Sequence, residues 1–520
     1  MIDESRAEYK RTKLPSLVGN IAGYRRRQCA LTLSKEKREA LLRSKRLCRT
    51  GFGVMHDDAD NGMLIDEEQS VLDDQTSSAV EELRCAMSFQ ERGALQRKRS
   101  ALSELRRLLS RSEFPPVEAA VEAGAIPLLV QCLSFGSADE QLLEAAWCLT
   151  NIAAGNPEET KTLLPALPLL IAHLGEKSSL PVAEQCAWAL GNVSGEGEEL
   201  RNILLAQGAL LPLARMVVNT KGSTARTAAW ALSNLIKGPD PAAATELARV
   251  DGMLDAIIRH LRKADEDLAT EIAWVVVYLS SLSDVAVNTL LQNDILQLLV
   301  QRLSTSDSPQ LLIPVLRSLG NVIASGSEVT VSFLLPGSEH THNVIKVITK
   351  CLKMDHRVLK KEAAWVLSNI SACSVPHKQL IHCSEAAPFL LNLISTATFD
   401  IRKEAAYVLG NLCVAPAEQP EKPKLITEHL VSLVEGGCLP GFVSLIKSVD
   451  TEAAKLGLQF LELVLRGMPR GEGPRLVEQV DGIEAMERYQ FHENGELRCM
   501  ANVLVDRYFG DTYGLDTATE

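Results

Sequence analysis

The residues with the most specific chemistry are tryptophan and asparagine pairs, four positions apart, that recur along the chain. The pairs are Trp147/Asn151, Trp188/Asn192, Trp230/Asn234 and Trp365/Asn369, and related pairs are Arg317/Asn321 and Tyr407/Asn411. An indole face attracts a Lys or Arg side chain by about 0.5–2 kcal/mol, and a carboxamide both donates and accepts hydrogen bonds. The pairs therefore suit an extended peptide, because the asparagines can hold its main chain while the rings hold the stems of basic side chains.

These pairs belong to a longer repeated motif, which reads Glu144-Ala-Ala-Trp-Cys-Leu-Thr-Asn151 in its first copy. The aromatic-type positions follow one another at steps of 41, 42, 44, 43, 48, 42 and 48 residues, the last step ending at Lys455. Turn residues such as Gly124 and Gly208 precede another helix in each unit. A period of roughly 40–47 residues built from two or three helices is typical of armadillo and HEAT repeats. We expect an all-α, right-handed superhelical armadillo solenoid of about ten three-helix repeats, with one long concave surface.

Helical geometry predicts which side of each motif is buried. At about 100° per residue, Trp147 and Asn151 lie roughly 40° apart, whereas Leu149 and Ile152 fall on the opposite side. The leucine side therefore forms the core. An asparagine buried without partners would cost about 1–3 kcal/mol, so we expect the Trp/Asn side to face outward along the concave surface, where water and a ligand reach it.

Composition and charge indicate how the chain is divided. It has 520 residues, 46% of them hydrophobic, and a net charge of −12. The first 50 residues hold 14 Lys and Arg against 5 Asp and Glu, which gives them +9 and leaves −21 for the rest. Residues 51–83 contain ten acids and no Lys or Arg. We expect a basic arm at 1–50, an acidic disordered linker at 51–83, a solenoid at 84–510 and a tail at 511–520. The acidic body should attract cationic partners and repel nucleic acid.

Several other classes of protein lack their sequence signatures here. No apolar run approaches the ~18 residues of a membrane helix, and the start of the chain lacks the basic-then-apolar layout of a secretory signal. The twelve cysteines occur singly, without zinc-site spacing, so we expect reduced thiols in the cytoplasm or nucleus and neither a metal nor a cofactor. Because no Gly-Lys-Ser/Thr loop, His-Glu-x-x-His or Gly-x-Ser-x-Gly motif is present, we expect no catalytic residues and no enzyme.

The ordered Trp-x-x-x-Asn units behind an arginine-rich arm resemble importin-α, the family of adaptors for basic nuclear localisation signals, and its plant-type members in particular. The resemblance covers nearly the whole chain. It implies a major signal-binding site made of three consecutive units, comprising Trp147, Asn151, Gly155, Thr160, Gln185, Trp188, Asn192, Glu196, Trp230 and Asn234. Glu196 stands where the family has an aspartate that pairs with a lysine of the signal, and Thr227 stands where it has an asparagine.

The same resemblance implies a minor signal-binding site further along the chain. It would comprise Arg317, Asn321, Glu362, Trp365, Asn369, Glu404, Tyr407 and Asn411, with the two glutamates as charge partners. Tyr407 replaces a tryptophan of the family, so we expect a weaker grip there. Glu271, Trp274 and Tyr278 would lie in the groove between the two sites, where the family also departs from the Trp/Asn pattern.

The basic arm resembles the segment that binds importin-β in this family and that, when free, occupies the adaptor's own groove. Its candidate residues are Arg25, Arg26, Arg27, Lys35, Lys37, Arg38, Arg43, Lys45 and Arg46. The family's Lys-Arg-Arg triplet reads Lys45-Arg46-Leu47 here, so one charge-assisted contact is missing and we expect weaker self-inhibition.

Near the end of the solenoid, the segment from Gln490 to Asn494 and the pair Tyr508 and Phe509 resemble the last repeat of the family. In the family this repeat engages a nuclear export receptor of the CAS type. We interpret His492 itself as a capping or packing histidine rather than as a ligand.

Together these features predict a nuclear import adaptor that shuttles between cytoplasm and nucleus and is found at the nuclear envelope or pore in transit. Its partners would be basic cargo proteins, importin-β and the export receptor, with no direct nucleic-acid binding and no membrane insertion. A generic armadillo scaffold is the main alternative, because it shares the fold and the period but needs neither the Trp/Asn units nor the basic arm. Direct RNA binding is a third alternative, which the charge of −21 opposes.

Overall fold

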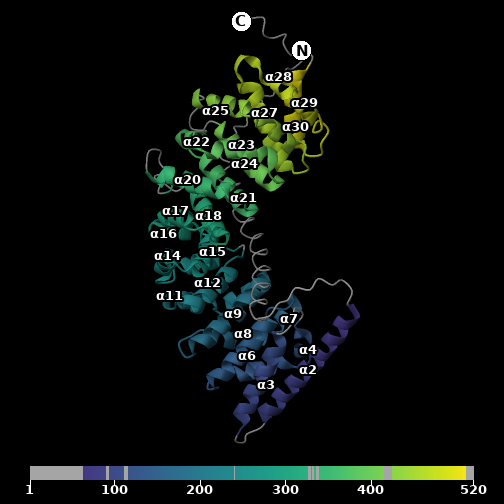
Figure 1. The fold of residues 1–520 in the computed structure, drawn as a ribbon, viewed down its shortest axis with the longest axis vertical. Helices are drawn as coiled ribbons and strands as arrows, with labels where there is room; N and C mark the ends of the chain where they lie inside the picture. Colours follow the sequence, from purple (N-terminus) through teal and green to yellow (C-terminus); the bar gives the residue numbers. More distant parts are fainter. Residues whose placement is uncertain are drawn as a thin grey trace, which may run out of the picture. The chain divides into compact units, whose positions relative to one another are not determined.

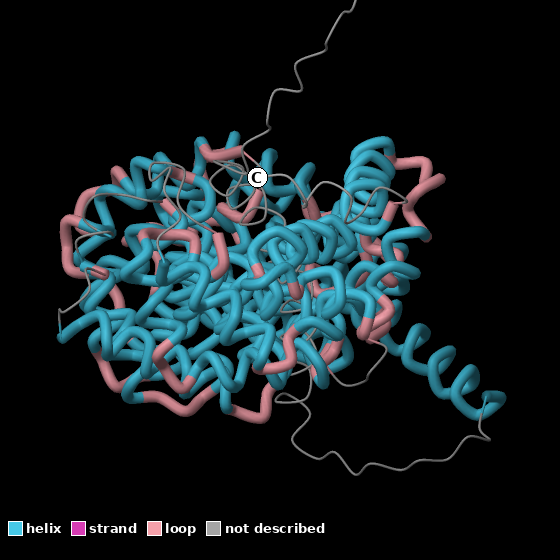
Figure 2. The backbone as a smooth tube through the Cα atoms, turned by 90° about the horizontal axis from the view of Figure 1, so that it is seen from above, coloured by secondary structure: helices cyan, strands magenta, loops and turns pink. Residues whose placement is uncertain are grey.

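Every regular element in the described part of the chain is a helix (Figure 2). The computed structural model describes residues 62–88, 93–110, 115–238, 240–325, 330, 333–334, 339–414 and 424–510. Contacts group these residues into two compact units, 62–293 and 294–510. The basic arm at 1–50, with its nine candidate arginines and lysines, and the tail at 511–520 lie outside the described residues.

The unit 62–293 begins with two helices, α2 (Gly62–Ser88) and α3 (Ala94–Leu109), and continues as triplets of helices (Figure 1). The triplets are α4 (Val117–Glu122), α5 (Ala125–Cys132) and α6 (Asp139–Ile152); α7 (Pro157–Lys161), α8 (Leu167–Ala172, after the 3-10 turn Leu164–Ala166) and α9 (Leu180–Glu196); α10 (Glu198–Ala206), α11 (Leu210–Asn219) and α12 (Gly222–Leu235); and α13 (Ala242–Ala248), α14 (Met253–Arg262) and α15 (Glu266–Leu282). Helix α16 (Asp284–Leu291) follows.

The unit 294–510 repeats the same pattern (Figure 1). Its helices are α17 (Ile295–Thr305) and α18 (Pro309–Ala324); α20 (Glu339–Lys353) and α21 (Arg357–Ser371); α22 (Val375–His382), α23 (Ala386–Thr396) and α24 (Phe399–Leu412); α25 (Lys424–Glu435), α26 (Leu439–Ile446) and α27 (Thr451–Gly467); and, after the 3-10 turn Pro469–Gly471, α28 (Gly473–Glu478), α29 (Gly482–Glu487) and α30 (Gly495–Phe509).

The last helix of each group, which we call the long helix, packs against the long helix of the next group. The series is α3, α6, α9, α12 and α15 in the unit 62–293, and α18, α21, α24, α27 and α30 in the unit 294–510. The predicted core side is confirmed, because Leu149, Ile152, Leu190 and Leu232 are fully or almost fully buried. Each long helix thus buries its leucine side in the core and places its flanks against two neighbours, as in other repeat proteins.

The turns that separate the first and second helices of a triplet depend on glycine. Gly124, between α4 and α5, has φ 83°, and Gly208, between α10 and α11, has φ 79°. Such left-handed backbone strains a residue that carries a Cβ. The predicted turn glycines therefore do mark the start of the second helix.

The predicted disordered linker at 51–83 is wrong over most of its length, because α2 spans Gly62–Ser88. Val80, Leu83 and Ala86 recur at helical spacing on α2 and are fully buried, and α2 packs against α3 and α4. Glu81 and Glu82 lie on its exposed side. Counting acidic residues hid this apolar side, which makes α2 part of the solenoid rather than a tether. Residues 51–61 lie outside the described residues.

Three further properties concern the described ranges alone. No single helix there has the length and apolarity to cross a membrane, although α10 with α11 and α25 with α26 meet that test as pairs bent by 80° and 83°. The ten cysteines in these ranges form no disulfide. Within them, no three His, Cys, Asp or Glu side chains gather closely enough to hold a metal ion.

Candidate functional site

The predicted site residues occupy the long helices in a fixed register. In the unit 62–293, Trp147, Trp188 and Trp230 lie on α6, α9 and α12, and an asparagine follows each of them one turn later. In the unit 294–510 the corresponding residues are Arg317 on α18, Trp365 on α21 and Tyr407 on α24. Because consecutive long helices pack against each other, each unit carries its own row of these side chains.

The aromatic rings are less exposed than the helical angles predict. Trp147, Trp188 and Tyr407 are half-buried, but Trp230, Trp274 and Trp365 are only 3%, 4% and 6% exposed. The prediction that the whole row lies open to water is therefore wrong for the last three. The angles place these rings correctly on the side away from the leucine core. They do not show how closely the next long helix packs on that side.

Glycine on a neighbouring helix explains two of the buried rings. A Cβ built on Gly191 of α9 would come within 2.6 Å of Cε3 of Trp230, and one on Gly320 of α18 within 2.8 Å of Cε3 of Trp365. Both glycines stand three positions after the aromatic-type position of their own helix. The missing side chain lets the indole of the following repeat lie directly against the helix backbone. The rings at these two positions are therefore part of the packing between repeats.

The asparagines also have structural partners on a neighbouring repeat, which the helical angles do not predict. Five of the amides donate to the preceding long helix or its C-cap: Asn151 to Ser110 Oγ (2.8 Å), Asn192 to Thr150 O (3.1 Å), Asn234 to Gly191 O (3.1 Å), Asn369 to Gly320 O (3.0 Å) and Asn411 to Ser368 O (3.1 Å). One N–H of each carboxamide is thus committed to joining two repeats. The second N–H and the carbonyl oxygen are the groups through which a ligand would be held.

The carbonyl ends of these amides differ between repeats. Asn234 Oδ1 accepts from Lys237 Nζ at 3.3 Å. Asn192 Oδ1 is buried and accepts no hydrogen bond within the described ranges, and Asn192 is 3% exposed. A buried acceptor without a donor costs about 1–3 kcal/mol. Asn192 therefore carries an unused acceptor on the side of α9 where the ligand was predicted.

Carboxylates stand one turn before several aromatic positions. Glu144 lies three residues before Trp147 and accepts from Arg106 Nε at 2.5 Å. In the unit 294–510, Glu362 lies three residues before Trp365 and holds Arg317 through two hydrogen bonds, from Nε at 3.0 Å and from the terminal nitrogen at 2.7 Å. Glu404, the other predicted charge partner of the minor site, and Glu271, predicted for the groove between the two sites, are buried. Asn321 on α18 and Tyr278 on α15 are buried as well.

The predicted lining residues Thr160 and Gln185 serve the packing of the repeats. Thr160 is buried and its Oγ1 donates to Asn156 O at 2.9 Å. Gln185 Nε2 donates to Thr150 Oγ1 at 2.7 Å, which ties α9 to α6. Gly155 lies in the turn after α6. A Cβ at this position would collide with the side chain of Glu159, which forms the capping box of α7. Thr160 and Gln185 therefore take part in the packing of the repeats behind the predicted site.

Glu196 and Thr227, the two departures from the family pattern, have different roles. Glu196 is the last residue of α9 and is half-buried. A carboxylate at a helix C-terminus is electrostatically unfavourable, so a cationic ligand placed there would offset that cost. Thr227 on α12 donates to Glu184 at 3.4 Å, together with Ser223 and Thr224 of the same helix, at 3.1 and 2.8 Å. Thr227 thus fixes an acidic side chain of α9.

The first member of the row, Arg106 with Ser110, is not a Trp/Asn pair and was not predicted from the sequence. Counting back one period of 41 residues from Trp147 and Asn151 reaches these two residues at the end of α3. Arg106 places its guanidinium carbon 4.6 Å from the centroid of the Trp147 ring. The repeat period identifies these two positions, although the residue types there are arginine and serine rather than tryptophan and asparagine.

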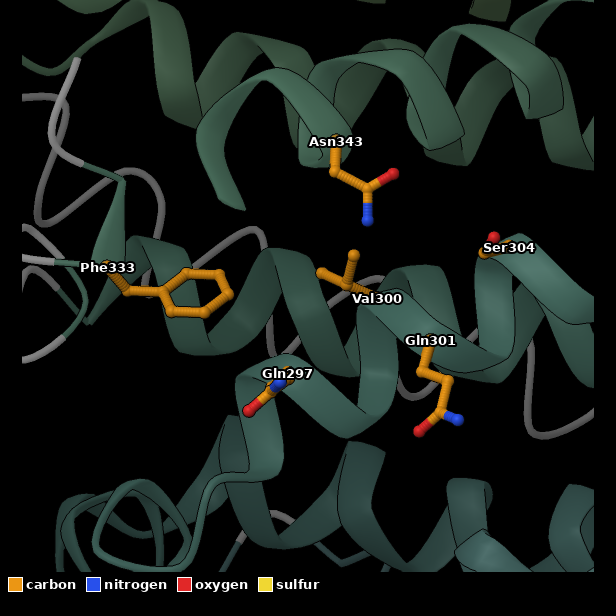
Figure 3. Close-up of a pocket in the computed structure, with 6 residues that line it drawn as sticks. All are labelled: Gln297, Val300, Gln301, Ser304, Phe333 and Asn343. Atoms are coloured by element: carbon orange, nitrogen blue, oxygen red, sulfur yellow. The ribbon is translucent and has the colours of Figure 1, made fainter. Parts of the chain in front are cut away.

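Two features lie away from the rows. His492 accepts from the backbone N–H of Asn494, the N-cap residue of α30, at 3.1 Å, which agrees with its interpretation as a capping histidine. A cavity of about 290 Å³ opens between α17 and α20, and its lining is mixed polar and apolar (Figure 3): Gln297, Val300, Gln301, Ser304, Phe333 and Asn343. None of these lining residues belongs to the predicted minor site, whose residues lie on the long helices α18, α21 and α24.

The class of protein follows from the helices and from the comparisons with known proteins. Residues 113–154 match the model of the armadillo/beta-catenin-like repeat, and residues 139–193 match the HEAT-like repeat. The crystal structure of an engineered protein superposes with a TM-score of 0.68 at 23% identity, covering 81% of this chain and 97% of its own. That likeness supports the fold. The chain is an all-α armadillo-repeat solenoid protein.

Two relatives that match almost end to end identify the family. Importin subunit alpha-9 of Arabidopsis thaliana is 65% identical, over 99% of this chain and 100% of its own length. Importin subunit alpha-2 of Oryza sativa subsp. japonica is 60% identical, over 98% and 97%. The chain therefore belongs to the importin-α family. It is a nuclear import adaptor and not an enzyme, and the generic scaffold alternative is not favoured.

Proposed function

We propose that this adaptor binds extended, Lys- and Arg-rich nuclear localisation signals on the rows carried by its long helices. The major site would be the row of the unit 62–293, with Trp147, Trp188 and Trp230 and their asparagines. The minor site would be the row of the unit 294–510, from Arg317 to Asn411. In both rows the asparagines would hold the main chain of the signal, while rings and carboxylates would hold its basic side chains.

The observation that carries this proposal is the unused acceptor of Asn192. Its amide end is fixed by Thr150 O, so the orientation of Oδ1 is fixed as well. No described residue donates to it. A peptide N–H would supply the missing hydrogen bond and recover about 1–3 kcal/mol without any demand on the side chain of the peptide. This is the contact expected for a ligand that is recognised partly through its main chain.

The unit 62–293 already holds one cationic side chain, Arg106, in the way proposed for the basic residues of the ligand. There, Trp147 already has a guanidinium over its face, and Glu144 takes the charge of the same side chain. An indole and a carboxylate one turn apart therefore suffice to hold an arginine. Trp188 is half-buried, and Glu196, at the end of the same helix, offers a further carboxylate.

The remaining partners follow from the family and from the charge of the chain. We propose that residues 1–50, with a charge of +9, bind importin-β and compete with cargo for the rows. We further propose that an export receptor of the CAS type contacts the last repeats, where Phe491 is 93% exposed. The adaptor would then shuttle between cytoplasm and nucleus through the nuclear pore.

Fluorescence anisotropy with a labelled Lys-Lys-Lys-Arg-Lys peptide tests the proposed major site. Trp188→Ala removes a half-buried ring and Asn192→Ala removes the unused acceptor, so we expect each to weaken binding by roughly tenfold or more. Glu196→Gln should also weaken binding, because it removes a negative charge near the peptide. Leu211→Ala is the matched control, because Leu211 is partly exposed on the second helix α11 of the same unit.

Binding that is indifferent to Trp188→Ala and Asn192→Ala would reject this site. A loss that accompanies a lowered melting temperature would be assigned to the fold, because the Asn192 amide also joins α9 to α6. For that reason each variant is first compared with the wild-type chain by circular dichroism.

A further inference from the structure

We propose that Arg106 is a built-in occupant of a cation subsite formed by Trp147 and Glu144, and that it limits how many basic side chains a signal places on the unit 62–293. The inference rests on the proposed function and adds a residue that sets ligand length. Arg106 would affect which signals bind, because its side chain covers the Trp147 ring and pairs with Glu144.

The subsite has the two parts that a Lys or Arg head requires. Trp147 supplies the ring and Glu144 supplies the carboxylate, and both project from α6 one turn apart. Arg106 reaches them from α3, with its guanidinium carbon 4.6 Å from the ring centroid and its Nε 2.5 Å from Glu144 Oε2. A guanidinium stacked on an indole and paired with a carboxylate is the arrangement proposed for the ligand's own basic residues.

The register shows that Arg106 occupies the position of a row member. It stands one period of 41 residues before Trp147, on the long helix that precedes α6. The other unit has the same relation, since Arg317 is the row member before Trp365 and pairs with Glu362, three residues before that tryptophan. In both units an arginine thus stands on the long helix before a tryptophan and neutralises the carboxylate beside that ring.

The two arginines differ in how firmly they are held. The side chains of Arg317 and Glu362 are 3% and 4% exposed, so breaking their pair would strand two buried charges. Those of Arg106 and Glu144 are 27% and 19% exposed, and water reaches them. Arg106 can therefore be removed without leaving a fully buried charge. Its removal would take the guanidinium off the Trp147 ring and leave the Glu144 carboxylate to pair with a basic residue of the ligand.

The test compares peptides of different length on the full chain. The base peptide is Lys-Lys-Lys-Arg-Lys, and four extended peptides add one Lys or one Ala at either end. For the wild-type chain we expect the added Lys to bind within about twofold of the added Ala. For Arg106→Ala we expect the added Lys at one end to bind roughly five- to tenfold tighter than the added Ala, as a cation on an indole beside a carboxylate predicts.

Three further variants separate this role from a structural one. Arg106→Gln keeps much of the packing stem and should show the same gain, which covers the case in which Arg106→Ala folds poorly. Arg106→Ala combined with Glu144→Gln should lose most of the gain. Arg107→Ala is the matched control, because Arg107 is exposed and paired with Glu104 on its own helix, and it should leave the Lys-to-Ala ratio unchanged.

The results distinguish the inference from the proposed function beneath it. If all chains bind the base peptide and the Lys-to-Ala ratio is the same with and without Arg106, the occupied subsite is rejected while the proposed function stands. If the wild-type chain does not bind the base peptide at all, both are rejected. A gain that appears equally with added Lys and added Ala would also overturn the inference, because it would reflect looser packing rather than a cation subsite.

Discussion

Lys378 shows how a single buried residue connects two helices that carry the proposed minor site. It lies on α22 and is 3% exposed. Its Nζ donates to Ser371 O at the end of α21 and to Asn411 O near the end of α24, both at 2.6 Å. Helix C-termini favour such a donor, because their last carbonyls lack partners within the helix. Lys378 therefore fixes the ends of the helices that carry Trp365 and Tyr407.

This lysine should make the stability of the chain depend on pH. Burial lowers the pKa of Lys378 from 10.5 to about 8, so between these values the unfolded chain binds more protons than the folded chain. Stability then rises with pH across that window. Relative to Lys378→Met, we expect the wild-type chain to gain about 2 kcal/mol between pH 7.5 and 9.5. Denaturant unfolding of both chains at the two pH values measures this difference.

The neighbours of Lys378 do not interfere with that comparison. Burial raises the pKa of the nearby Cys373 and Cys413 thiols, and burial lowers the pKa of His377 and His429. All four groups are present in both chains, so their titration enters both unfolding curves and is removed when the two chains are compared. An equal change in stability for the wild-type chain and for Lys378→Met would contradict the assignment. The neutral amine still has two N–H groups, so it can serve both carbonyls above its pKa.

For single residues, the sequence predicted correctly which side chains of the long helices lie in the core. It did not predict the contacts made on the opposite side of these helices. Leu149 and Ile152 lie in the core as their angles predict. Trp230 and Asn192 also lie on the side of their helices that the angles predict. Such angles describe one helix alone and carry no information about the helix packed next to it. They therefore could not show that Gly191 admits the Trp230 ring or that Thr150 O takes the Asn192 amide. Such contacts depend on packing between repeats that are about 40 residues apart.

At the scale of the elements, the repeat period was the informative signal, and local composition was misleading. The period places α6, α9 and α12 correctly, because each long helix carries the same motif at the same interval. Helix α2 has no copy of that motif. Its many acidic residues suggested a disordered linker, although Val80 and Leu83 have the spacing of a buried helical face. Charge density alone does not exclude an amphipathic helix.

The close approach of α9 and α12 leads to a prediction for Gly191→Ala. The new methyl group would meet the Trp230 ring, so we expect the chain to lose about 1–3 kcal/mol of stability. Displacing Trp230 should also weaken binding of a Lys-rich peptide to the proposed major site. Thermal unfolding and anisotropy with the same peptide measure the two effects.

Gly410→Ala is a matched control for Gly191→Ala. Gly410 occupies the same position on α24, three residues after Tyr407, but the nearest atom to its added Cβ is Leu456 Cδ1 at 3.7 Å. That is ordinary contact, and alanine favours a helix over glycine by about 1 kcal/mol. We therefore expect Gly410→Ala to melt at or slightly above the wild-type temperature. If Gly191→Ala behaves in the same way, the packing of Trp230 against Gly191 does not limit stability.

At the scale of the whole molecule, charge is distributed unevenly along the chain. Residues 1–50 carry +9, and the remaining residues carry −21. Opposite charges on one chain attract each other in the same way as they attract partners, and salt screens both effects. We therefore expect the basic arm to compete with Lys-rich cargo, as proposed above. How strongly it competes depends on its best-matched basic cluster.

The cluster at residues 45–47 has two basic residues instead of the three expected from the family. Lys45-Arg46-Leu47 stands where the family has three basic residues, and a hydrogen bond between charged groups contributes about 1.5–3 kcal/mol. If the arm binds the rows more weakly, it competes less with the cargo, and the affinity of the full chain for cargo is lowered by a smaller factor. We expect removal of residues 1–50 to tighten binding of the Lys-Lys-Lys-Arg-Lys peptide by less than roughly tenfold. Leu47→Arg in the full chain should weaken peptide binding, because it restores the missing contact. A much larger gain on removal, or no effect of Leu47→Arg, would show that another part of the arm controls access to the rows.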